Sequence, residues 1–596
     1  MSCCRKEIKS YPFNEEGLIQ LRNSQSGKNW PVVYLLHDES SLYIGETTNA
    51  ATRMGQHLRN DEKKNLTFIE IVDDGEFNKS VALDYEQRLI KYCSVDNRFK
   101  NILNKNKGQQ ASHDYYNRKM YQKNFRVLWQ KLKEHNLVNN SLEVIENDNI
   151  FKYSPYNALN GEQNEVSIAV INEILDSLEN GEKGISLVDG CAGTGKTVLA
   201  ISIINSLVNA INIDDEMLEE NDSEFIDEEK KNVLLRLKRY IMHERNGKPF
   251  NIGFVFPMPS IRGTVQKVFK ECGNGLLKSM VIGPLDVIKQ EYDILVVDES
   301  HRLSKRKNLT NYRDFDKVCK ELNMDKNVCN QLDWILASAK HTVLFYDKFQ
   351  SIKSSDITYN EYQNSLNSYR EHLKEHILTT QMRCEGGDSY INYVKSIMNC
   401  SCGGFKNIEN YKFLLFDDVN EMINIVREKD EEVGLSKTVA GFSWEWKTKP
   451  QKKLKDDLDY YNKLVADGKF DISIGDYKYI WNLASEDWVT REDSRYTIGC
   501  IHTTQGYDLN YVGVIFGEEI DYDKKKKSIV INLDNFKDGK VKQNTDAKIV
   551  EELIINTYTT ILARGIKGSF VYACNPNMKD YLKQYIASAN ETTIQD

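Results

Sequence analysis

The sequence lacks any long apolar segment. It has no run of about 18 apolar residues, and its first residues, MSCCRKEIKSYPFNEEG, lack the apolar stretch of a signal peptide. We therefore expect no membrane partner and a cytoplasmic location. The 12 cysteines also lack a repeating spacing, and Cys400-Ser-Cys402 is followed by no second pair at zinc-site distance. Free thiols in a reducing compartment are the better interpretation of these cysteines.

Acidic residues outnumber basic ones overall, but the charge is unevenly distributed along the chain. The net charge of −9 excludes a protein that is uniformly positive. Between Lys91 and Lys133, however, eleven Lys and Arg residues stand against two acids, whereas Asp214 to Glu229 holds ten acids in sixteen positions. The basic run suits contact with phosphate groups, although a solvated helix face has the same composition. We interpret the acidic run as an exposed insertion that stays away from a polyanion.

The order of apolar segments predicts the domain organisation. At 596 residues the chain is too long for one core. Residues 31–44 read as a hairpin, PVVYLL and SLYIG around HDESS, and residues 50–58, 79–92 and 115–136 have helical spacing. From about Phe151, buried strands alternate with helices, which predicts parallel sheets covered on both faces. The predicted strands are ISLVDG, IGFVFP, ILVVDES and HTVLFYD, followed by YKFLLFD, KTVAGFSW, YTIGCIH, YVGVIFG and SFVYAC.

A phosphate-binding loop follows the first of these strands. Residues 190–197, GCAGTGKT, fit the pattern G-x-x-x-x-G-K-[ST] between an apolar strand and a helix. Gly190, Gly193 and Gly195 let backbone N–H groups turn toward phosphates at the start of the helix. Lys196 would reach the β- and γ-phosphates of ATP, and Thr197 would bind Mg²⁺ through its hydroxyl.

An acidic pair ends a later buried strand. Asp298 and Glu299 follow ILVV about a hundred residues after the loop. Asp298 would hold the same Mg²⁺, and Glu299 would polarise the attacking water as general base. Two solvated acids at a strand end are the alternative, which the loop upstream makes the weaker one.

Further motifs resemble those of superfamily 1 helicases, in the same order. They are LNGEQ at 159–163, FPMPS at 256–260, YDKFQ at 346–350, TQMR at 380–383, IHTTQGYD at 501–508 and TTILARG at 559–565. The resemblance implies that Gln163 contacts adenine and that Gln350 senses the γ-phosphate. It also implies that Gln505 and Gly506 belong to the nucleotide-responsive motif V, where Asp508 replaces the usual Glu. Arg383 and Arg564 would be arginine fingers that make closure of the two domains depend on ATP.

The sequence over about residues 155–580 resembles a bacterial family related to Schlafen-type helicases. The motifs that carry this resemblance are DESHR, TQMR and AGFSWEW at 440–446. Trp444 and Trp446 could stack on bases, but packing in the core or at a domain interface is the better interpretation.

A spaced set near the N-terminus resembles the GIY-YIG endonuclease domain, over about residues 28–108. It consists of Tyr34, Tyr43-Ile44-Gly45, Arg53, His57, Glu86 and Asn101, with Val32-Val33-Tyr34 in place of Gly-Ile-Tyr. The resemblance implies that Glu86 binds one divalent ion, Mg²⁺ or Mn²⁺, and that the Tyr34 and Tyr43 hydroxyls activate and orient water. Arg53, one helical turn before His57, would neutralise charge on the phosphate. Each residue alone has an ordinary structural explanation, and the domain could be inactive.

Together these patterns predict an α/β chain: a small α+β GIY-YIG domain at 1–110, then a basic helical connector at 111–150. Two RecA-like domains follow at 151–370, with insertions near 212–250 and 305–330, and at 371–596. We expect an ATP-dependent translocase or helicase coupled to an endonuclease, acting on nucleic acid, most simply DNA. Bacterial defence against phage is the preferred role, DNA repair or recombination is one alternative, and an ATP-switched sensor with an inactive nuclease-like domain is another. Protein partners are not indicated.

Overall fold

The computed structural model describes residues 7–75, 77–104, 115–148, 151, 153, 159–212, 228–272, 275–309, 311–347, 350, 354–381, 384–449, 458–484, 488–504, 507–543 and 545–590. The chain divides into two compact units, and each is described by itself. The first unit comprises Met1–Leu175, Ile201–Pro249 and Val268–Leu276. The second comprises Asp176–Ala200, Phe250–Lys267 and Leu277–Asp596.

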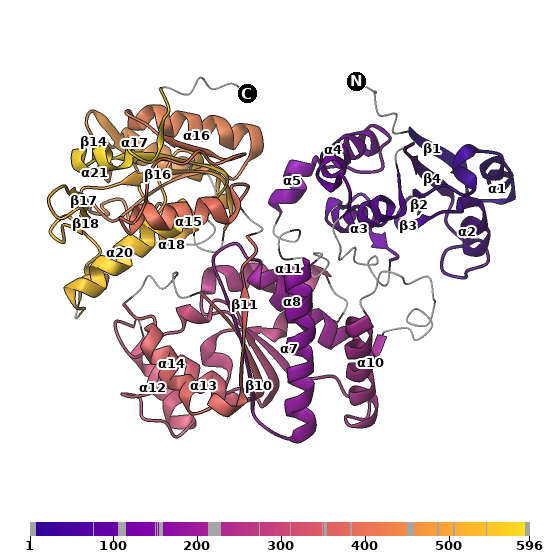
Figure 1. The fold of residues 1–596 in the computed structure, drawn as a ribbon, viewed down its shortest axis with the longest axis horizontal. Helices are drawn as coiled ribbons and strands as arrows, with labels where there is room; N and C mark the ends of the chain where they lie inside the picture. The colour runs from indigo at the N-terminus through magenta and orange to yellow at the C-terminus, as the bar shows by residue number, and fades with distance from the viewer. Residues whose placement is uncertain are drawn as a thin grey trace. The chain divides into compact units, whose positions relative to one another are not determined.

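A five-stranded sheet organises the N-terminal part of the first unit (Figure 1). Its strand order is β1-β4-β2-β3-β5, antiparallel except for the parallel pair β3 and β5. The strands are β1 (Glu7–Pro12), β2 (Val32–His37), β3 (Ser41–Thr47), β4 (Phe68–Asp73) and β5 (Asn101–Ile102). The predicted hairpin is thus β2 and β3, paired so that Tyr34 lies opposite Gly45.

The sheet is buried on both faces, because side chains alternate along β2. Val33 and Leu35 enter a core with α3 and α4, whereas Tyr34 and Leu36 enter a second core with α1 and α2. Figure 1 shows these helix pairs on opposite sides of the sheet. The helices are α1 (Glu15–Arg22), α2 (Ala50–His57), α3 (Lys79–Asp96), α4 (Arg118–Glu134) and α5 (Leu142–Asn147). Asn14, Asn49 and Asn78 cap the first three of them.

The expected basic connector is packed into the same domain. Its helix, α4, places Phe125, Leu128, Trp129 and Leu132 in the core that α3 forms with the sheet. The hydroxyl of Tyr85 on α3 also donates to a backbone carbonyl of α4, that of Tyr121, at 2.7 Å. The apolar face of α4 thus packs this segment against the N-terminal core.

The first parallel sheet has the order β11-β6-β10-β9-β7-β8, and all its pairs are parallel. This confirms the predicted alternation. Its strands are β6 (Gly184–Gly190), β7 (Ile252–Val255), β8 (Val281–Ile282), β9 (Tyr292–Val297), β10 (Ala339–Tyr346) and β11 (Leu373–Leu378). The helices of this part of the chain are α7 (Gly161–Asn180), α8 (Lys196–Asn209), α10 (Glu228–His243), α11 (Pro259–Cys272), α12 (Tyr312–Glu321), α13 (Gln331–Ser338) and α14 (Tyr359–Asn367).

Two expected boundaries look different in the structure. β11 pairs with β6, so the first sheet extends to Leu378, beyond the boundary expected at 370 and 371. Of the insertion expected near 305–330, residues 312–321 form α12. Most of the acidic run, residues 213–227, lies outside the described residues.

The second parallel sheet has the order β13-β16-β19-β12-β20. Its strands are β12 (Lys412–Leu415), β13 (Lys437–Ala440), β16 (Leu509–Phe516), β19 (Gly565–Ala573) and β20 (Ala587–Ser588), and two hairpins pair β14 (Ile472–Ile474) with β15 (Tyr477–Tyr479) and β17 (Ile520–Asp523) with β18 (Ser528–Ile531). Its helices are α15 (Gly387–Met398), α16 (Val419–Val433), α17 (Asp459–Ala466), α18 (Ile501–Thr504), α19 (Gly539–Lys542), α20 (Ala547–Leu562) and α21 (Pro576–Leu582).

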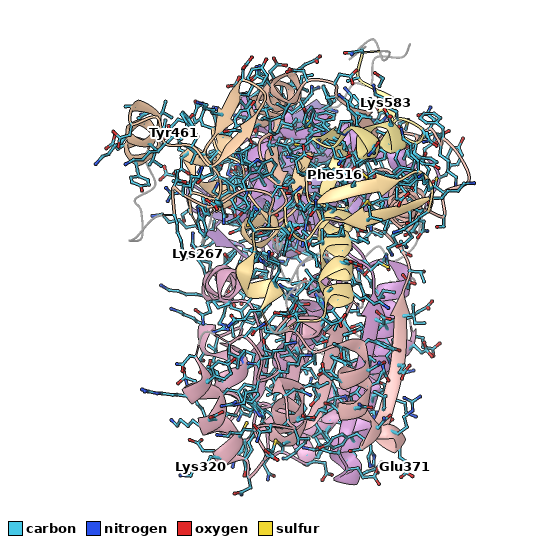
Figure 2. All side chains as sticks on the ribbon, turned by 90° about the vertical axis from the view of Figure 1, so that its left-hand side faces the viewer. Lys267, Lys320, Glu371, Tyr461, Phe516 and Lys583 are labelled. Carbon is cyan, nitrogen blue, oxygen red and sulfur yellow. The ribbon has the colours of Figure 1, made fainter. Side chains whose placement is uncertain are left out.

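Helices cover both faces of this sheet. α16 packs against it in one core, and α15 and α20 pack in another. Phe516, at the end of β16, is labelled in Figure 2. In the second core its ring stacks on Tyr558 of α20 with 4.4 Å between ring centroids. The predicted strand YTIGCIH was wrong, because Ile498 and Gly499 form only isolated bridges and α18 begins at Ile501.

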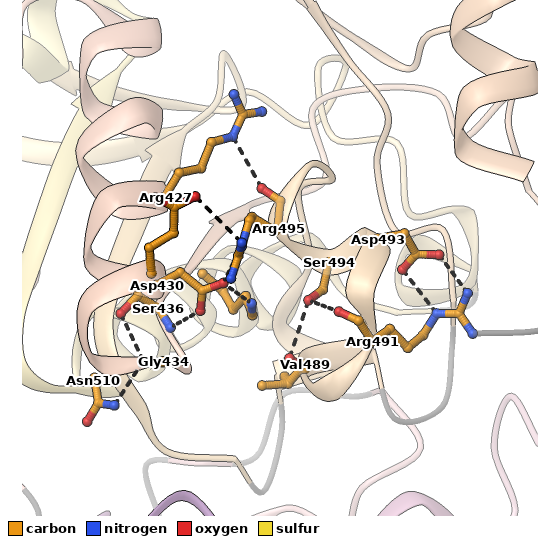
Figure 3. Close-up of polar contacts among 12 residues, drawn as sticks. Arg427, Asp430, Gly434, Ser436, Val489, Arg491, Asp493, Ser494, Arg495 and Asn510 are labelled. Atoms are coloured by element: carbon orange, nitrogen blue, oxygen red, sulfur yellow. Dashed lines mark hydrogen bonds and ion pairs between the residues drawn. The ribbon is translucent and has the colours of Figure 1, made fainter. Parts of the chain in front are cut away.

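A buried carboxylate holds the segment that leads to α18. Asp430 on α16 accepts hydrogen bonds from the Ser436 amide (2.9 Å), Lys437 Nζ (2.9 Å) and Arg495 Nε (3.1 Å) (Figure 3). Because these donors belong to different segments, one carboxylate fixes the start of β13 relative to the chain just before motif V.

Candidate functional site

Two tyrosines and a histidine meet on one face of the N-terminal sheet. Tyr34 lies on β2, Tyr43 on β3 and His57 at the end of α2. The Tyr34 hydroxyl lies 2.8 Å from His57 Nε2, and the ring centroids of Tyr43 and His57 are 5.2 Å apart. The hairpin register and the end of one helix therefore bring together three residues that the sequence separates.

Gly45 is required by the close approach of Tyr34. A Cβ at Gly45 would lie 2.2 Å from the Tyr34 hydroxyl oxygen and 2.4 Å from Cζ. The tyrosine ring thus lies directly over the glycine that faces it across the hairpin. This contact gives a physical reason for glycine within the Tyr-Ile-Gly motif.

Burial controls the protonation of this cluster. Burial first, and then Tyr43, raise the pKa of Tyr34, while the guanidinium of Arg53 opposes the shift. Burial, followed by the charges of Lys63 and Arg53, lowers the pKa of His57 to about 3. The imidazole is therefore neutral near pH 7 and can accept a hydrogen bond from the Tyr34 hydroxyl at Nε2.

Glu86 on α3 belongs to the same electrostatic neighbourhood. Burial and the charge of Glu46 raise the pKa of Glu86 to about 8, while Lys79 and Arg53 lower it. Lys79 Nζ itself lies 2.7 Å from Glu46 Oε1. A buried carboxyl beside a second carboxylate is charged most easily with a cation next to it. Glu86 could therefore serve as one ligand of a divalent ion, although the described residues contain no group of three or more metal-ligating side chains.

Two neighbours of this cluster were missed from the sequence. Asn101 is exposed on β5, whereas Asn104 is buried, accepts from the Ile44 amide at 3.0 Å and donates to the Ile44 carbonyl at 2.6 Å. Asn104 therefore fixes the backbone of the Tyr-Ile-Gly motif. Lys63, which follows α2, places Nζ 3.5 Å from the centroid of the Tyr43 ring. Its position in an irregular polar segment offered no signal.

The phosphate loop lies between β6 and α8. Gly193 and Gly195 have φ values of 88° and 77°, which only glycine adopts easily. Lys196 Nζ donates to the carbonyl oxygens of Gly190 and Cys191 and lies 3.6 Å from Asp347 Oδ2. The lysine is thus folded onto its own loop.

The acidic pair follows β9 and faces the loop. Thr197 Oγ1 donates to Asp298 Oδ2 at 2.6 Å, so the two expected magnesium ligands are already adjacent. Burial and Glu299 raise the pKa of Asp298 to about 6. Burial would also raise the pKa of Glu299, but His301, whose Nε2 lies 2.9 Å away, and the charges of Lys196 and Arg564 lower it. Glu299 therefore keeps its charge, as a general base must.

Glu299 also has a strained backbone, with φ of 52°. Such conformations cost energy for residues other than glycine and persist where the surroundings enforce them. Arg302 in the same turn (Ser300–Arg302) is one such restraint, because its Nη1 lies 2.6 Å from buried Asp356 and 3.3 Å from the Gln350 carbonyl. Gln350 in turn donates to Asp347 at 2.6 Å, so the motifs DESHR and YDKFQ are joined.

Two further described residues act on the site, Gln381 from the segment after the first sheet and Arg564 from the second sheet. Arg564, after α20, is buried, donates from Nη1 to the Tyr507 carbonyl at 3.3 Å and acts electrostatically on Glu299. Gln381, which follows β11, donates to the Ala192 carbonyl at 2.6 Å and was not among the expected site residues. Arg383, Gln505 and Gly506 lie outside the described residues.

Gln163 lies near the start of α7 in the first unit. Its side-chain oxygen accepts from the Asn160 amide at 3.1 Å, and its own amide donates to the Asn160 side chain at 2.7 Å. This reciprocal pair caps the helix. Contact with adenine stays a prediction.

The two tryptophans of AGFSWEW favour the packing interpretation. Trp444 and Trp446 are half-buried against the core that contains α16, and the Trp446 ring lies 6.4 Å from that of Trp481.

Comparison with known proteins finds a domain match over each of the two regions that contain these sites. The GIY-YIG catalytic domain matches residues 31–92, and the Schlafen group 3 DNA/RNA helicase domain matches residues 183–575. These matches define a class of protein in which a GIY-YIG domain is joined to a helicase domain. Because the second match spans well over half of the chain, the protein belongs to the Schlafen group 3 helicase-domain family. The expected fusion is confirmed, and the chain is an enzyme with helicase (NTPase) and nuclease domains.

Individual proteins that resemble this chain share a low sequence identity with it. The uncharacterized protein YPL245W of Saccharomyces cerevisiae is 24% identical over 431 residues, which cover 66% of this chain and 83% of that protein. A structure from a study of DNA unwinding at forked dsDNA by two coordinating Pif1 helicases is 12% identical, with a TM-score of 0.25, over 69% of this chain and 92% of that one. The Pif1 helicase from Candida albicans is also 12% identical, with a TM-score of 0.24, over 71% and 99%. Among the described residues, no helix is both long and apolar enough to span a membrane.

Proposed function

We propose that the chain is an ATP-dependent DNA translocase or helicase that supplies DNA to a divalent-metal-dependent endonuclease in the same polypeptide. The observation that carries this proposal is the grouping of Lys196, Thr197, Asp298 and Glu299 within electrostatic reach of Arg564. Helicase domains bind nucleic acid and use ATP, and GIY-YIG nucleases use divalent metals, so each half has a defined chemistry.

In the ATPase site, Glu299 takes a proton from the attacking water, since its carboxylate stays charged. Lys196 leaves the carbonyls of its loop and neutralises the β- and γ-phosphates. Thr197 and Asp298 would hold Mg²⁺, and the ion would supply stabilisation of charge on the phosphate oxygens. Arg564 and Arg383 approach the γ-phosphate from the second domain, so closure depends on ATP.

In the nuclease site, Tyr34 orients the attacking water through its hydroxyl, which the hydrogen bond to His57 Nε2 holds in place. Tyr43 assists in orienting this water, and Arg53 neutralises the phosphate. Glu86 would hold one Mg²⁺ or Mn²⁺, and the ion would supply stabilisation of the leaving oxygen.

A motor joined to a nuclease suits the removal of foreign DNA, and we propose a cytoplasmic role in bacterial defence against phage or mobile elements. The test is a nuclease and ATPase assay of the purified full chain with single-stranded, duplex and forked DNA. Glu86→Ala is expected to abolish cleavage and spare ATP hydrolysis, whereas Lys196→Ala or Glu299→Gln should have the converse effect. If the wild type neither cleaves DNA nor hydrolyses ATP faster in the presence of DNA, the proposal is refuted in favour of an ATP-switched sensor.

A further inference from the structure

The phosphate loop is contacted by a side chain from the segment that leads into the second sheet. β11 pairs with β6 in a register that sets Leu378 opposite Gly190, so the chain leaving β11 passes beside the loop leaving β6. Gln381 lies in this exit segment, and its Nε2 donates to the Ala192 carbonyl oxygen at 2.6 Å. The pairing of two strands therefore delivers Gln381 to the loop.

The carboxamide of Gln381 is fitted closely to the loop. A Cβ at Gly193 would lie 1.9 Å from Gln381 Oε1 and 2.7 Å from Cδ. Gly193 is therefore needed twice, for its φ of 88° and for this close approach. A contact that excludes even a methyl group defines one position of the exit segment on the loop.

Side-chain donors hold the carbonyls of the loop in a consecutive row. Lys196 Nζ donates to Gly190 and Cys191, and Gln381 donates to the next carbonyl, that of Ala192. Lys395 on α15 lies close as well, with Nζ 3.1 Å from Cys191 Sγ. Lys196 must leave these carbonyls to reach phosphates, so nucleotide binding changes the very stretch of backbone to which Gln381 is attached.

We propose that Gln381 is a positioning residue that couples occupancy of the phosphate loop to the exit segment and α15. Binding of a triphosphate releases Lys196 from the loop, the loop carbonyls move, and the bond from Gln381 transmits that movement toward residues 384–398. The position that the exit segment takes on the loop would therefore differ in energy between the nucleotide-free and the nucleotide-bound protein. Ligand-driven switching requires such a difference. This inference rests on the proposed ATP site and adds a route from that site to the second sheet.

The test compares Gln381→Met with Lys374→Met in the full chain. Methionine keeps the length of glutamine but cannot donate a hydrogen bond. Lys374 is exposed on β11, the strand that precedes Gln381. Hydrogen exchange of residues 384–398 is measured with and without ATPγS, whose binding is measured separately. The stimulation of ATP hydrolysis by single-stranded DNA is a second readout.

In wild type and Lys374→Met, ATPγS is expected to change exchange in α15. In Gln381→Met this response should be lost although ATPγS still binds, and the stimulation by DNA should fall about five- to tenfold, as for one lost hydrogen bond. If ATPγS changes hydrogen exchange in α15 of Gln381→Met as much as in the wild type, the inference is overturned. Loss of ATPγS binding itself would also overturn it, since that would place Gln381 in the nucleotide site. If the wild-type response is present but DNA does not stimulate hydrolysis, the proposed motor fails, while the exchange response of Gln381→Met still decides the inference.

Discussion

The hydroxyl oxygen of Tyr34 lies 2.8 Å from Nε2 of His57, and both side chains are buried, with 1% and 4% of their surface exposed. A charged imidazole would be unstable in this position, and burial together with Lys63 and Arg53 lowers the pKa of His57 to about 3. His57 is thus a neutral hydrogen-bond acceptor that orients the Tyr34 hydroxyl, and the burial of both groups opposes transfer of the proton between them.

A pH-dependent stability follows from the buried histidine. In the unfolded chain His57 is protonated below about pH 6.5, whereas in the folded chain it is protonated only below about pH 3. The free energy of unfolding therefore decreases as the pH falls from about 6.5 to 3. At pH 5 the loss is about 2 kcal/mol. Hydrogen exchange of the β2 and β4 amides at pH 7.5 and 5 measures it. His57→Gln should lack this pH-dependent part, whereas exposed His135→Gln should retain it, and equal slopes for all three proteins would contradict the assignment.

A methyl group at Gly45 should disable the nuclease. Gly45→Ala places its Cβ 2.2 Å from the Tyr34 hydroxyl, which must then leave His57. Overpacking of this kind costs about 1–3 kcal/mol. We expect a lower melting temperature and loss of DNA cleavage, with ATP hydrolysis retained. Gly75→Ala is the control, because a Cβ there has nothing within 4 Å. Wild-type cleavage by Gly45→Ala would show that Tyr34 is free to move.

Local sequence patterns predicted the strands but not their neighbours. The phosphate loop, the acidic pair and the hairpin of Tyr34 and Tyr43 follow from short patterns with a fixed local geometry. The place of β11 does not, because strand order depends on pairing between distant segments and β11 joins β6 at the edge of the first sheet. A polar strand of this kind, LKEHIL, has no apolar run to mark it.

Side-chain partners were harder still to predict. Asn101 and Asn104 are equivalent by composition, and only the parallel pairing of β3 and β5 brings Asn104 onto the Ile44 backbone. YTIGCIH has the apolar, β-branched composition of a strand, yet α18 begins within it at Ile501, where Thr503 and Thr504 hydroxyls bond the Cys500 carbonyl. Composition favours a strand there, and local hydrogen bonds favour the turn of helix.

Removal of Arg302 should be strongly destabilising. Its side chain and that of Asp356 are each 2% exposed and lie 2.6 Å apart, so Arg302→Met removes a buried positive charge from beside a buried carboxylate. A cost of about 3–5 kcal/mol is expected. Arg370→Met is the matched control, since Arg370 and Glu375 are 63% and 53% exposed and pair at 3.8 Å. Thermal unfolding of the variants measures the difference, and adding Asp356→Asn to Arg302→Met should recover part of the loss. Similar melting temperatures for the two single variants would contradict this account.

Arg564→Gln should separate nucleotide binding from hydrolysis. Arg564 is buried beside Tyr507, contributes to lowering the pKa of Glu299, and comes from the second sheet. A finger that stabilises charge mainly in the transition state leaves ground-state binding nearly intact, so ADP affinity should change little while single-turnover ATP hydrolysis falls on the order of 10³-fold. Lys548→Gln, at an exposed position near the start of α20, should behave as wild type. An equal loss of ADP affinity and hydrolysis in Arg564→Gln would mean that the residue supports the fold of the site, because a structural defect weakens both, whereas a finger acts on the reacting phosphate alone.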